Sequence, residues 1–243
     1  MLVIDAGNTS VKFARVARAG ASPKLLRSVP TAELTAAKAK RAGTKAKSVV
    51  VASVVPSVSR ILQRAYPDAR FIGPRTKLDF LSMVDRKTFG ADRLANVAAA
   101  RAKYGRNVLV VSFGTATTFD LIDAKGVHRG GAIAPGWKAF ADILHARTAL
   151  LPRVDAKKAP HFIARNTRGA LAAGVNGGYA AMVSQIVEAM RKEARIKNLR
   201  VFFTGGDAAT VSRILPWKAV SDPLLTLRGI ALLAQGIARE ASK

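Results

Sequence analysis

The chain has no cysteine among its 243 residues and only three histidines. The lack of thiols excludes disulfide scaffolds, thiolate metal sites and cysteine nucleophiles, and it favours a reducing compartment such as the cytoplasm. The histidines (His128, His145 and His161) are scattered along the sequence, which argues against a histidine-based metal site.

Targeting and membrane signals are also missing. The residues after Met1 include Asp5 and lack the basic segment and long apolar core of a signal peptide. The longest uncharged run, 169–187, is long enough for a membrane span, but it contains four glycines and Asn176. Its apolar residues recur on one helical face, which predicts a buried amphipathic helix. We therefore expect no membrane association.

Acidic residues are scarce. There are 15 against 40 basic residues, which gives a net charge of +25, and none lies between Glu33 and Asp68. Such a positive field attracts polyanions. The basic residues are spread over every segment, without the aromatic pattern of an RNA-binding sheet. This favours a solvated basic surface with weak, non-specific nucleic-acid binding.

What is present is an ordinary globular composition, with 49% apolar and 23% charged residues. We predict strands at 2–4, 11–16, 49–54, 108–112, 117–122, 132–133 and 201–204. We predict helices at 57–65, 91–103, 136–150, 167–195, 208–215 and 223–241, with a solvated helix over 31–46. Because strands and helices alternate, the fold class is α/β.

A strand–glycine turn–strand pattern occurs twice, about a hundred residues apart, at Val3–Phe13 and Val110–Asp120. Gly7 and Gly114 let the backbone approach an anion closely, so each turn predicts a phosphate-binding loop. The alternative is a pair of ordinary β-hairpins. Side-chain donors surround the turns: Asn8, Thr9, Thr115, Thr117 and Lys12. Neither a Walker nor a Rossmann glycine motif occurs.

Six short motifs in this order resemble those of type III pantothenate kinases. They are D-x-G-N-T-x-x-K at Asp5–Lys12, G-x-D-R at Gly90–Arg93, G-T-A-T-T at Gly114–Thr118, G-G-A-I-A-P-G at Gly130–Gly136, Asn166-Thr167, and T-G-G-D at Thr204–Asp207. The resemblance implies two ribonuclease-H-like halves of the actin-like ATPase superfamily, each a mixed sheet flanked by helices. We expect an N-terminal half, 1–105, with the first phosphate hairpin. The C-terminal half, 106–243, would carry the second hairpin and the adenosine motif.

The resemblance also implies an activity: ATP-dependent phosphorylation of pantothenate to 4′-phosphopantothenate, the first step of coenzyme A biosynthesis. It implies a cytoplasmic homodimer that uses ATP with Mg²⁺. Asp92 matches the catalytic residue of the family. The residues matching its ATP site are Asp5, Ala6, Gly7, Asn8, Thr9, Ser10, Val11, Lys12, Thr115, Gly205 and Gly206. Those matching its pantothenate site are Gly90, Ala91, Asp92, Arg93 and Thr167.

From the residues alone, several of these roles stay open. Phosphoryl transfer to a hydroxyl needs a carboxylate that accepts the proton, and Asp5, Asp120, Asp123 and Asp207 are further candidates. Asp5 is better suited to organise a metal ion or water near the phosphates. Asp92 stands at a predicted helix start, where an aspartate also serves as a cap. Arg93 suits the pantothenate carboxylate, although it could equally be a surface residue.

Two positions depart from the family pattern. Many members have an aspartate, linked to an activating monovalent cation (K⁺ or NH₄⁺), where Ser112 stands; a subset has a hydroxyl residue there. Because a hydroxyl lacks the charge of a carboxylate, the cation site is expected to differ or to be absent. The family also has a tyrosine and a proline where Met83 and Arg86 stand. This predicts that the loop before Gly90, which leads to the pantothenate pocket, forms a different wall there.

Two other functions compete with the pantothenate kinase hypothesis. One is a non-catalytic relative acting as an accessory transcriptional regulator or nucleic-acid-associated protein, which the net charge supports. The presence of Asp92, both glycine turns and Lys12 argues against it. The other is a related kinase acting on a sugar or acid, which the G-x-D-R and G-G-A-I-A-P-G motifs disfavour.

Overall fold

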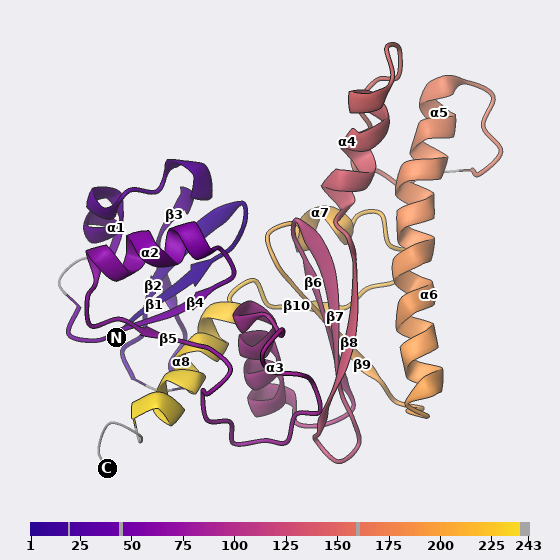
Figure 1. The fold of residues 1–243 in the computed structure, drawn as a ribbon. Coiled ribbons are helices and arrows are strands. Elements are labelled where there is room, and N and C mark those ends of the chain that lie inside the picture. Colours follow the sequence, from indigo (N-terminus) through magenta and orange to yellow (C-terminus); the bar gives the residue numbers. More distant parts are fainter. Residues whose placement is uncertain (19, 44–45, 159–160, 239–243) are drawn as a thin grey trace. The chain divides into compact units, whose positions relative to one another are not determined.

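The computed structural model describes residues 1–18, 20–43, 46–158 and 161–238 (Figure 1). By its internal contacts the chain divides into two compact units. The first contains residues 1–106, 126–128 and the segment from Leu224 onward, and the second contains 107–125 and 129–223. The C-terminal segment thus belongs to the first unit, while the halves 1–105 and 106–243 stay a prediction about domains.

The first unit is built on a five-stranded sheet in the order β3-β2-β1-β4-β5. Strands β1, β2 and β3 pair antiparallel, and β4 and β5 continue the sheet in parallel. The elements of this unit are β1 (Leu2–Ala6), β2 (Ser10–Arg15), β3 (Lys24–Pro30), a 3₁₀ turn (Thr31–Glu33), α1 (Ala36–Gly43), β4 (Val49–Ser53), α2 (Pro56–Ala65), β5 (Arg70–Phe71), α3 (Ala91–Tyr104) and α8 (Leu225–Ala238).

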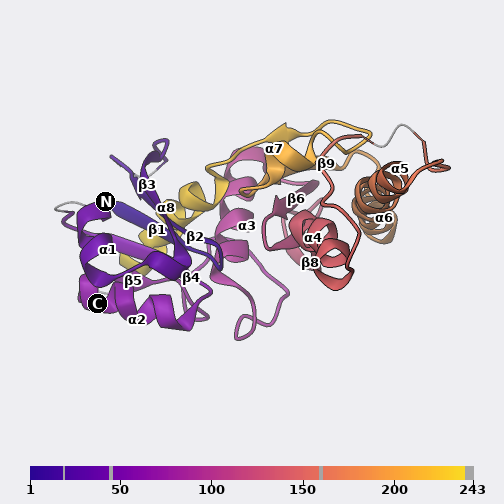
Figure 2. The ribbon, with the colours of Figure 1, turned by 90° about the horizontal axis from the view of Figure 1, so that it is seen from above.

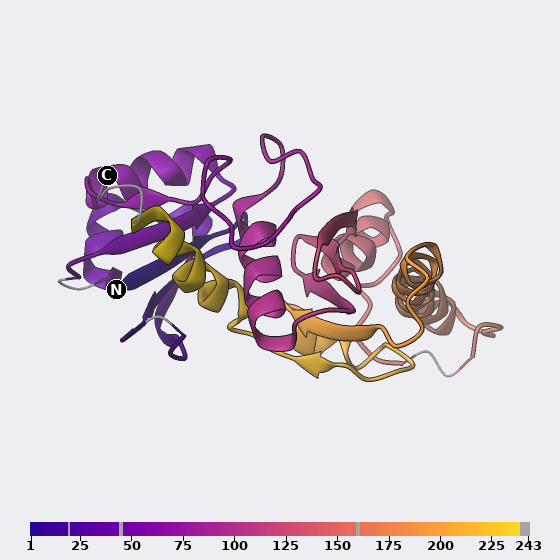
Figure 3. The ribbon, with the colours of Figure 1, turned by 90° about the horizontal axis from the view of Figure 1, so that it is seen from below.

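Helices cover both faces of this sheet. Ile4, Phe13 and Val51 point to the side of α1 and α2, whereas Val3 and Val50 point to the side of α3 and α8. This alternation follows from the period of two in a β-strand. Helices α3 and α8 lie side by side (Figure 3). Their close approach depends on Gly229, where a Cβ would lie 1.8 Å from the carbonyl oxygen of Ala95.

The second unit repeats this strand order, with a sheet β10-β9-β6-β7-β8. Again the first hairpin, β6 and β7, is antiparallel. Strand β9 pairs in parallel with β6, and β10 pairs in parallel with β9. Its elements are β6 (Val108–Phe113), β7 (Ala116–Ile122), β8 (His128–Pro135), α4 (Trp137–Arg147), α5 (Thr167–Leu171), a π-helical segment (Ala172–Gly177), α6 (Gly178–Glu193), β9 (Arg200–Thr204), α7 (Ala208–Val211) and β10 (Val220–Ser221). The predicted α/β class with duplicated mixed sheets is confirmed.

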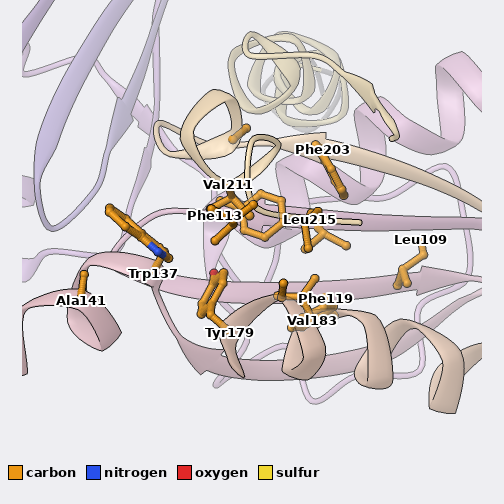
Figure 4. Packing of buried hydrophobic residues seen from close by; sticks show 14 of the residues in the cluster. Leu109, Phe113, Phe119, Trp137, Ala141, Tyr179, Val183, Phe203, Val211 and Leu215 are labelled. Carbon is orange, nitrogen blue, oxygen red and sulfur yellow. The ribbon is translucent and has the colours of Figure 1, made fainter. Parts of the chain in front are cut away.

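One face of the second sheet carries the main core of this unit (Figure 4). Phe113, Phe119 and Phe203 project from β6, β7 and β9 against α4, α6 and α7. Figure 2 shows α4 and α6 as neighbours over this sheet. The opposite face has a different composition because alternate residues point there, among them Ser112, Thr118 and Asp120.

The long uncharged segment folds as the sequence predicts. Residues 167–193 form α5, the π-helical segment and α6 without a break, and Leu171, Val175, Tyr179 and Val183 are buried along one stripe. Within the described ranges, no helix is both long enough and apolar enough to cross a membrane.

Candidate active site

The first glycine turn joins β1 to β2. Asp5 lies opposite Lys12 in the strand register. The turn closes through the amide of Gly7, which donates to the carbonyl of Ser10 at 3.1 Å, and the hydroxyl of Thr31 donates to the carbonyl of Gly7 at 2.7 Å. Asn8 and Thr9 are exposed at the tip. The predicted hairpin is therefore formed, with its polar tip accessible.

Asp5 is half-buried at the end of β1. Burial raises the pKa of its carboxyl group from 3.8 to about 6; Lys12 opposes this shift and the negative charge of Asp92 adds to it. The carboxylate of Asp92, in the first turn of α3, is thus near enough for its charge to act on Asp5. A cation between them would relieve their repulsion.

The G-x-D-R motif forms the start of α3. Gly90 is the N-cap residue and Asp92 lies in the first turn, where its Oδ1 accepts a hydrogen bond from the amide of Arg93 at 2.8 Å. A Cβ on Gly90 would lie 2.6 Å from that same oxygen, so only glycine leaves room for this carboxylate position. The guanidinium of Arg93 lies 4.3 Å from the ring centre of Phe89. Stacking on a ring is typical of a preoriented arginine.

The loop before this motif is held by the arginine that departs from the family pattern. Arg86 donates from its Nη2 to the carbonyls of Thr76 and Gly73. Met83, at the other departing position, has a side chain 62% exposed. Arg86 therefore has a structural role in this loop, whereas Met83 leaves an apolar side chain on its surface.

Three glycine motifs meet at the second turn, which joins β6 to β7. The amide of Gly114 donates to the carbonyl of Ala116, and the amide of Gly136 donates to the carbonyl of Thr115, both at 3.1 Å. Gly205 has a φ of +93°, and a Cβ there would lie 2.2 Å from the carbonyl oxygen of Phe113. The sequence predicted a role for these glycines one by one; the structure shows that they form a single cluster.

Lys138 and Tyr179, which the sequence analysis did not single out, support this cluster through Asp207 and Thr117. Lys138, in the first turn of α4, forms an ion pair of 2.7 Å with Asp207 at the start of α7. Beneath it, the hydroxyl groups of Thr117 and Tyr179 are 2.5 Å apart and buried. One sequence signal could have found part of this set, namely a polar Asn176 within an apolar helical stripe; the indole of Trp137 donates to its amide oxygen at 2.9 Å.

Thr167 occupies a different part of the second unit. It begins α5, where the side chain of Asn166 accepts a hydrogen bond from the amide of Gly169 at 2.8 Å. Figures 1 and 2 show α5 well separated from α7. The structure thus does not bring Thr167 beside Gly205 and Gly206, and their expected assignment to two different ligands stays a prediction.

A divalent cation would have only a small number of carboxylate ligands in this protein. Among the described residues, no cluster of three or more histidine, aspartate or glutamate side chains has a metal-binding arrangement. Asp5 and Asp92 together fit Mg²⁺, because this ion uses one or two carboxylates and takes its other ligands from water and phosphate. Ser112 is half-buried in the second unit and supplies no charge for a monovalent cation.

Comparisons with known folds agree with the duplicated architecture. The structure of a Campylobacter jejuni protein, provisionally described as a Baf family transcriptional activator, has a TM-score of 0.66 at 20% identity and covers all of both chains. Component A of the (R)-2-hydroxyglutaryl-CoA dehydratase of Acidaminococcus fermentans has a TM-score of 0.55 at 13% identity, over 100% of this chain and 99% of that one. An archaeal actin homologue in complex with ADP has a TM-score of 0.50 at 9% identity, over 98% of this chain and 100% of that one.

Sequence comparisons give the family. The family model for type III pantothenate kinase matches residues 1–189. A type III pantothenate kinase of Methylacidiphilum infernorum is 32% identical over 248 aligned residues, covering 100% of this chain and 91% of the relative. Another, from Syntrophotalea carbinolica, is 40% identical over 193 residues, covering 77% of this chain and 75% of the relative. The chain therefore belongs to the type III pantothenate kinase family.

Proposed function

We propose that this protein is an enzyme that transfers the γ-phosphoryl group of ATP to the primary hydroxyl of pantothenate, which yields 4′-phosphopantothenate for coenzyme A biosynthesis. The observation that carries this proposal is the group at the start of α3. There a carboxylate, Asp92, interacts with a second carboxylate, Asp5, and stands next to an arginine held over an aromatic ring. This group contains a proton acceptor, a metal ligand and an anion-binding side chain.

Asp92 is the proton acceptor in this scheme. The pantothenate oxygen forms a bond to the γ-phosphorus as the bond between that phosphorus and the β–γ bridging oxygen breaks, and ADP leaves with the bonding electrons. The hydroxyl proton passes to the carboxylate of Asp92 and later to water. Such transfers proceed mainly through positioning and charge stabilisation, with the base contributing about 10²-fold or more.

The other residues divide into two sets. The first turn, Asp5–Lys12, together with Thr115, Gly205 and Gly206, would bind ATP, with Lys12 and the glycine turns near the phosphates. Gly90, Ala91, Arg93 and Thr167 would bind pantothenate, where the planar guanidinium of Arg93 suits the carboxylate. This division is supported by the clustering of Gly114, Gly136 and Gly205 and by the stacking of Arg93 on Phe89.

Mg²⁺ would be held near Asp5, with Asp92 as the second nearby carboxylate, and would neutralise phosphate charge when bound. A half-buried carboxylate whose pKa is raised to about 6 is costly to keep charged. Binding of a divalent cation would give this carboxylate a function. Dependence on K⁺ or NH₄⁺ is expected to be weak, because Ser112 lacks the carboxylate that attracts a hard cation.

We further infer a homodimer, working in the cytoplasm. The support is that the second unit exposes several large apolar side chains, of which Leu150 and Ile163 are 91% and 92% exposed; the others are Ile143, Leu144 and Phe162. Exposed apolar side chains that gather on a surface mark association sites. Light scattering after gel filtration tests the inference: Ile163→Asp is expected to yield monomer, whereas the control Leu25→Asp, on an exposed position of β3, is expected to leave the dimer intact.

The test of the activity is ADP release with and without pantothenate. Wild-type protein is expected to turn over only when pantothenate is present. Asp92→Asn keeps the size and a hydrogen-bond acceptor but not the charged base, so turnover is expected to fall about 10²-fold or more while the melting temperature stays close to that of the wild type. Near-wild-type turnover of this variant at saturating substrates would refute the role of Asp92.

A further inference from the structure

Two arginines of helix α3 each lie against a phenylalanine of the loop that precedes the helix. The guanidinium carbon of Arg93 is 4.3 Å from the ring centre of Phe89, and that of Arg101 is 5.5 Å from the ring centre of Phe80. Both rings are partly buried and pack against the same apolar cluster. Of the two arginines only Arg93 belongs to the proposed pantothenate site, so the two pairs allow a role in binding to be compared with packing alone.

The ring of Phe89 also contacts a histidine. Its centre lies 5.1 Å from that of the imidazole of His128, and the two planes meet at 66°, which is an edge-to-face arrangement. The space left beside the ring, lined by Arg86, Ala91 and Leu94, is only about 10 Å³ and is too small for more than one water molecule. Phe89 therefore has little freedom to tilt.

The imidazole of His128 is fixed in turn by the loop. His128 is 0% exposed, and its Nδ1 lies 2.8 Å from the hydroxyl oxygen of Ser82. The amide of His128 donates to the carbonyl of Leu81 at 3.0 Å, and its carbonyl accepts from the amide of Met83 at 2.9 Å. Such bonds are typical of a core histidine. What distinguishes His128 is that its ring supports the ring of Phe89.

An arginine that is ordered before the substrate arrives binds a carboxylate more tightly. The side chain of arginine has several rotatable bonds, and fixing them on binding costs free energy. A ring stacked over the guanidinium restricts these bonds but uses none of the N–H donors, which point outward in the plane of the group. The stack on Phe89 thus orients Arg93 for a bidentate contact with a carboxylate.

We propose that Phe89 and His128 are positioning residues that hold Arg93 for the carboxylate of pantothenate, and that they make the enzyme selective for substrates with this group. The inference rests on the proposed kinase function, in which Arg93 binds pantothenate. Phe89 acts on the substrate only through Arg93, and His128 only through Phe89. The alternative is that Phe89 merely packs the start of α3 against Leu94, as an apolar residue before an N-cap often does.

The experiment compares pantothenate with its alcohol analogue, in which a hydroxymethyl group replaces the carboxylate. Phe89→Leu keeps an apolar side chain and removes the ring. Its kcat/KM for pantothenate is expected to fall about three- to tenfold, the range that corresponds to ordering one flexible side chain. Its kcat/KM for the alcohol analogue and its KM for ATP are expected to stay within about twofold of the wild-type values.

The chain itself supplies the matched control. Phe80→Leu removes the ring beside Arg101, on the same helix and against the same apolar cluster. Both leucine variants are expected to melt at a somewhat lower temperature than the wild type, but Phe80→Leu is expected to leave kcat/KM unchanged for both compounds. In an Arg93→Ala background, Phe89→Leu is expected to have no further effect on pantothenate, because the side chain that it positions is gone.

Nuclear magnetic resonance reports the order of Arg93 without any substrate. The Nε–H signal of Arg93, identified by its absence from Arg93→Lys, is expected to shift and to show greater mobility in Phe89→Leu. His128→Asn keeps a polar group for Ser82 and removes the ring. It is expected to change the Arg93 signal and kcat/KM for pantothenate in the same direction as Phe89→Leu, by a smaller amount.

The inference is overturned if Phe89→Leu impairs pantothenate and the alcohol analogue equally, if its effect persists in the Arg93→Ala background, or if the Arg93 signal does not change. Unchanged kinetics and an unchanged signal in His128→Asn would refute the role of His128. A failure of the kinase function is distinguishable, because the wild type would then release no ADP in response to pantothenate, while the Arg93 signal would still respond to Phe89→Leu.

Discussion

Asp5 illustrates how a site residue can lower the stability of the fold that carries it. Its pKa is raised to about 6, mainly by burial, with Asp92 adding to the shift and Lys12 opposing it. Between about pH 4 and pH 6 the native protein keeps a proton that the unfolded chain has lost, so the free energy of unfolding falls as the pH rises through this range. Above pH 6 the carboxylate is charged in both states, and it lowers the free energy of unfolding by a constant amount.

We therefore expect Asp5→Asn to be more stable than the wild type at pH 8. The change from 3.8 to about 6 corresponds to at most about 3 kcal/mol. The advantage is expected to shrink below pH 6 and to vanish near pH 4, where both side chains are neutral. Denaturant unfolding at pH 4, 5, 6 and 8 measures it, and parallel curves for the two proteins would contradict the assignment. Turnover of the variant is expected to be low at every pH.

Arg93 gives a second prediction at this scale. Arg93→Ala removes a charge-assisted contact to the pantothenate carboxylate, worth about 1.5–3 kcal/mol, so the KM for pantothenate is expected to rise by one to two orders of magnitude. The KM for ATP is expected to change little. Steady-state kinetics with each substrate varied in turn measures both values. An equal rise in both KM values would indicate that Arg93, stacked on Phe89, stabilises the loop and does not bind pantothenate.

At the scale of elements, the turn between β9 and α7 offers two adjacent glycines with different surroundings. Gly205 has a φ of +93° and no room for a Cβ, whereas a Cβ on Gly206 would meet nothing within 4 Å. Gly205→Ala is expected to lower stability by about 2 kcal/mol or more, through backbone strain and the clash with Phe113. Gly206→Ala is expected to melt at the same temperature as the wild type and to bind ATP more weakly.

Melting curves and ATP titrations on both alanine variants test this pair. If Gly206→Ala also binds ATP like the wild type, the nucleotide does not approach the backbone at that residue. If Gly205→Ala keeps full stability, the packing of this turn against the end of β6 is unimportant. The pair thus separates the fold of the turn from its proposed ligand.

Much of the element pattern was accessible from the sequence, because buried strands and amphipathic helices have clear periods. The hairpins around Gly7 and Gly114 were predicted, as was the helix that contains Asp92. The strands β3, β5 and β10 were missed: β3 exposes Leu25 and buries little, and the other two are two residues long. Edge strands of this kind carry no clean alternation.

The pairing of Ser112 with Thr118 and with Thr204 shows why part of the site could not be predicted. Thr118 and Thr204 both stand in motifs that the sequence displays, yet their meeting depends on the register of β9 against β6. No local pattern specifies a pairing between residues so far apart in the chain. The ion pair of Lys138 with Asp207 likewise exists only because two helix starts converge on one turn.

At the scale of the whole molecule, the net charge of +25 predicts a property that is separate from catalysis. We expect weak binding to DNA and RNA without sequence preference, since the basic residues contact phosphates alone. Affinity is expected to fall by orders of magnitude between about 50 and about 200 mM salt as condensed counterions are released. Competition titrations with specific and scrambled duplexes measure this. A duplex preferred about a thousandfold near 150 mM salt would instead indicate specific recognition.

The return of the C-terminal segment to the first unit has a consequence for synthesis. The face of the first sheet that carries Val3 and Val50 is covered partly by α8, whose Gly229 fits against Ala95 of α3. A ribosome makes this helix only after the whole second unit. Until then the nascent first sheet keeps an apolar face open, and the final docking must close a loop of more than a hundred residues, which slows folding. The newborn chain is therefore most vulnerable to aggregation and to chaperone capture at its first-made sheet.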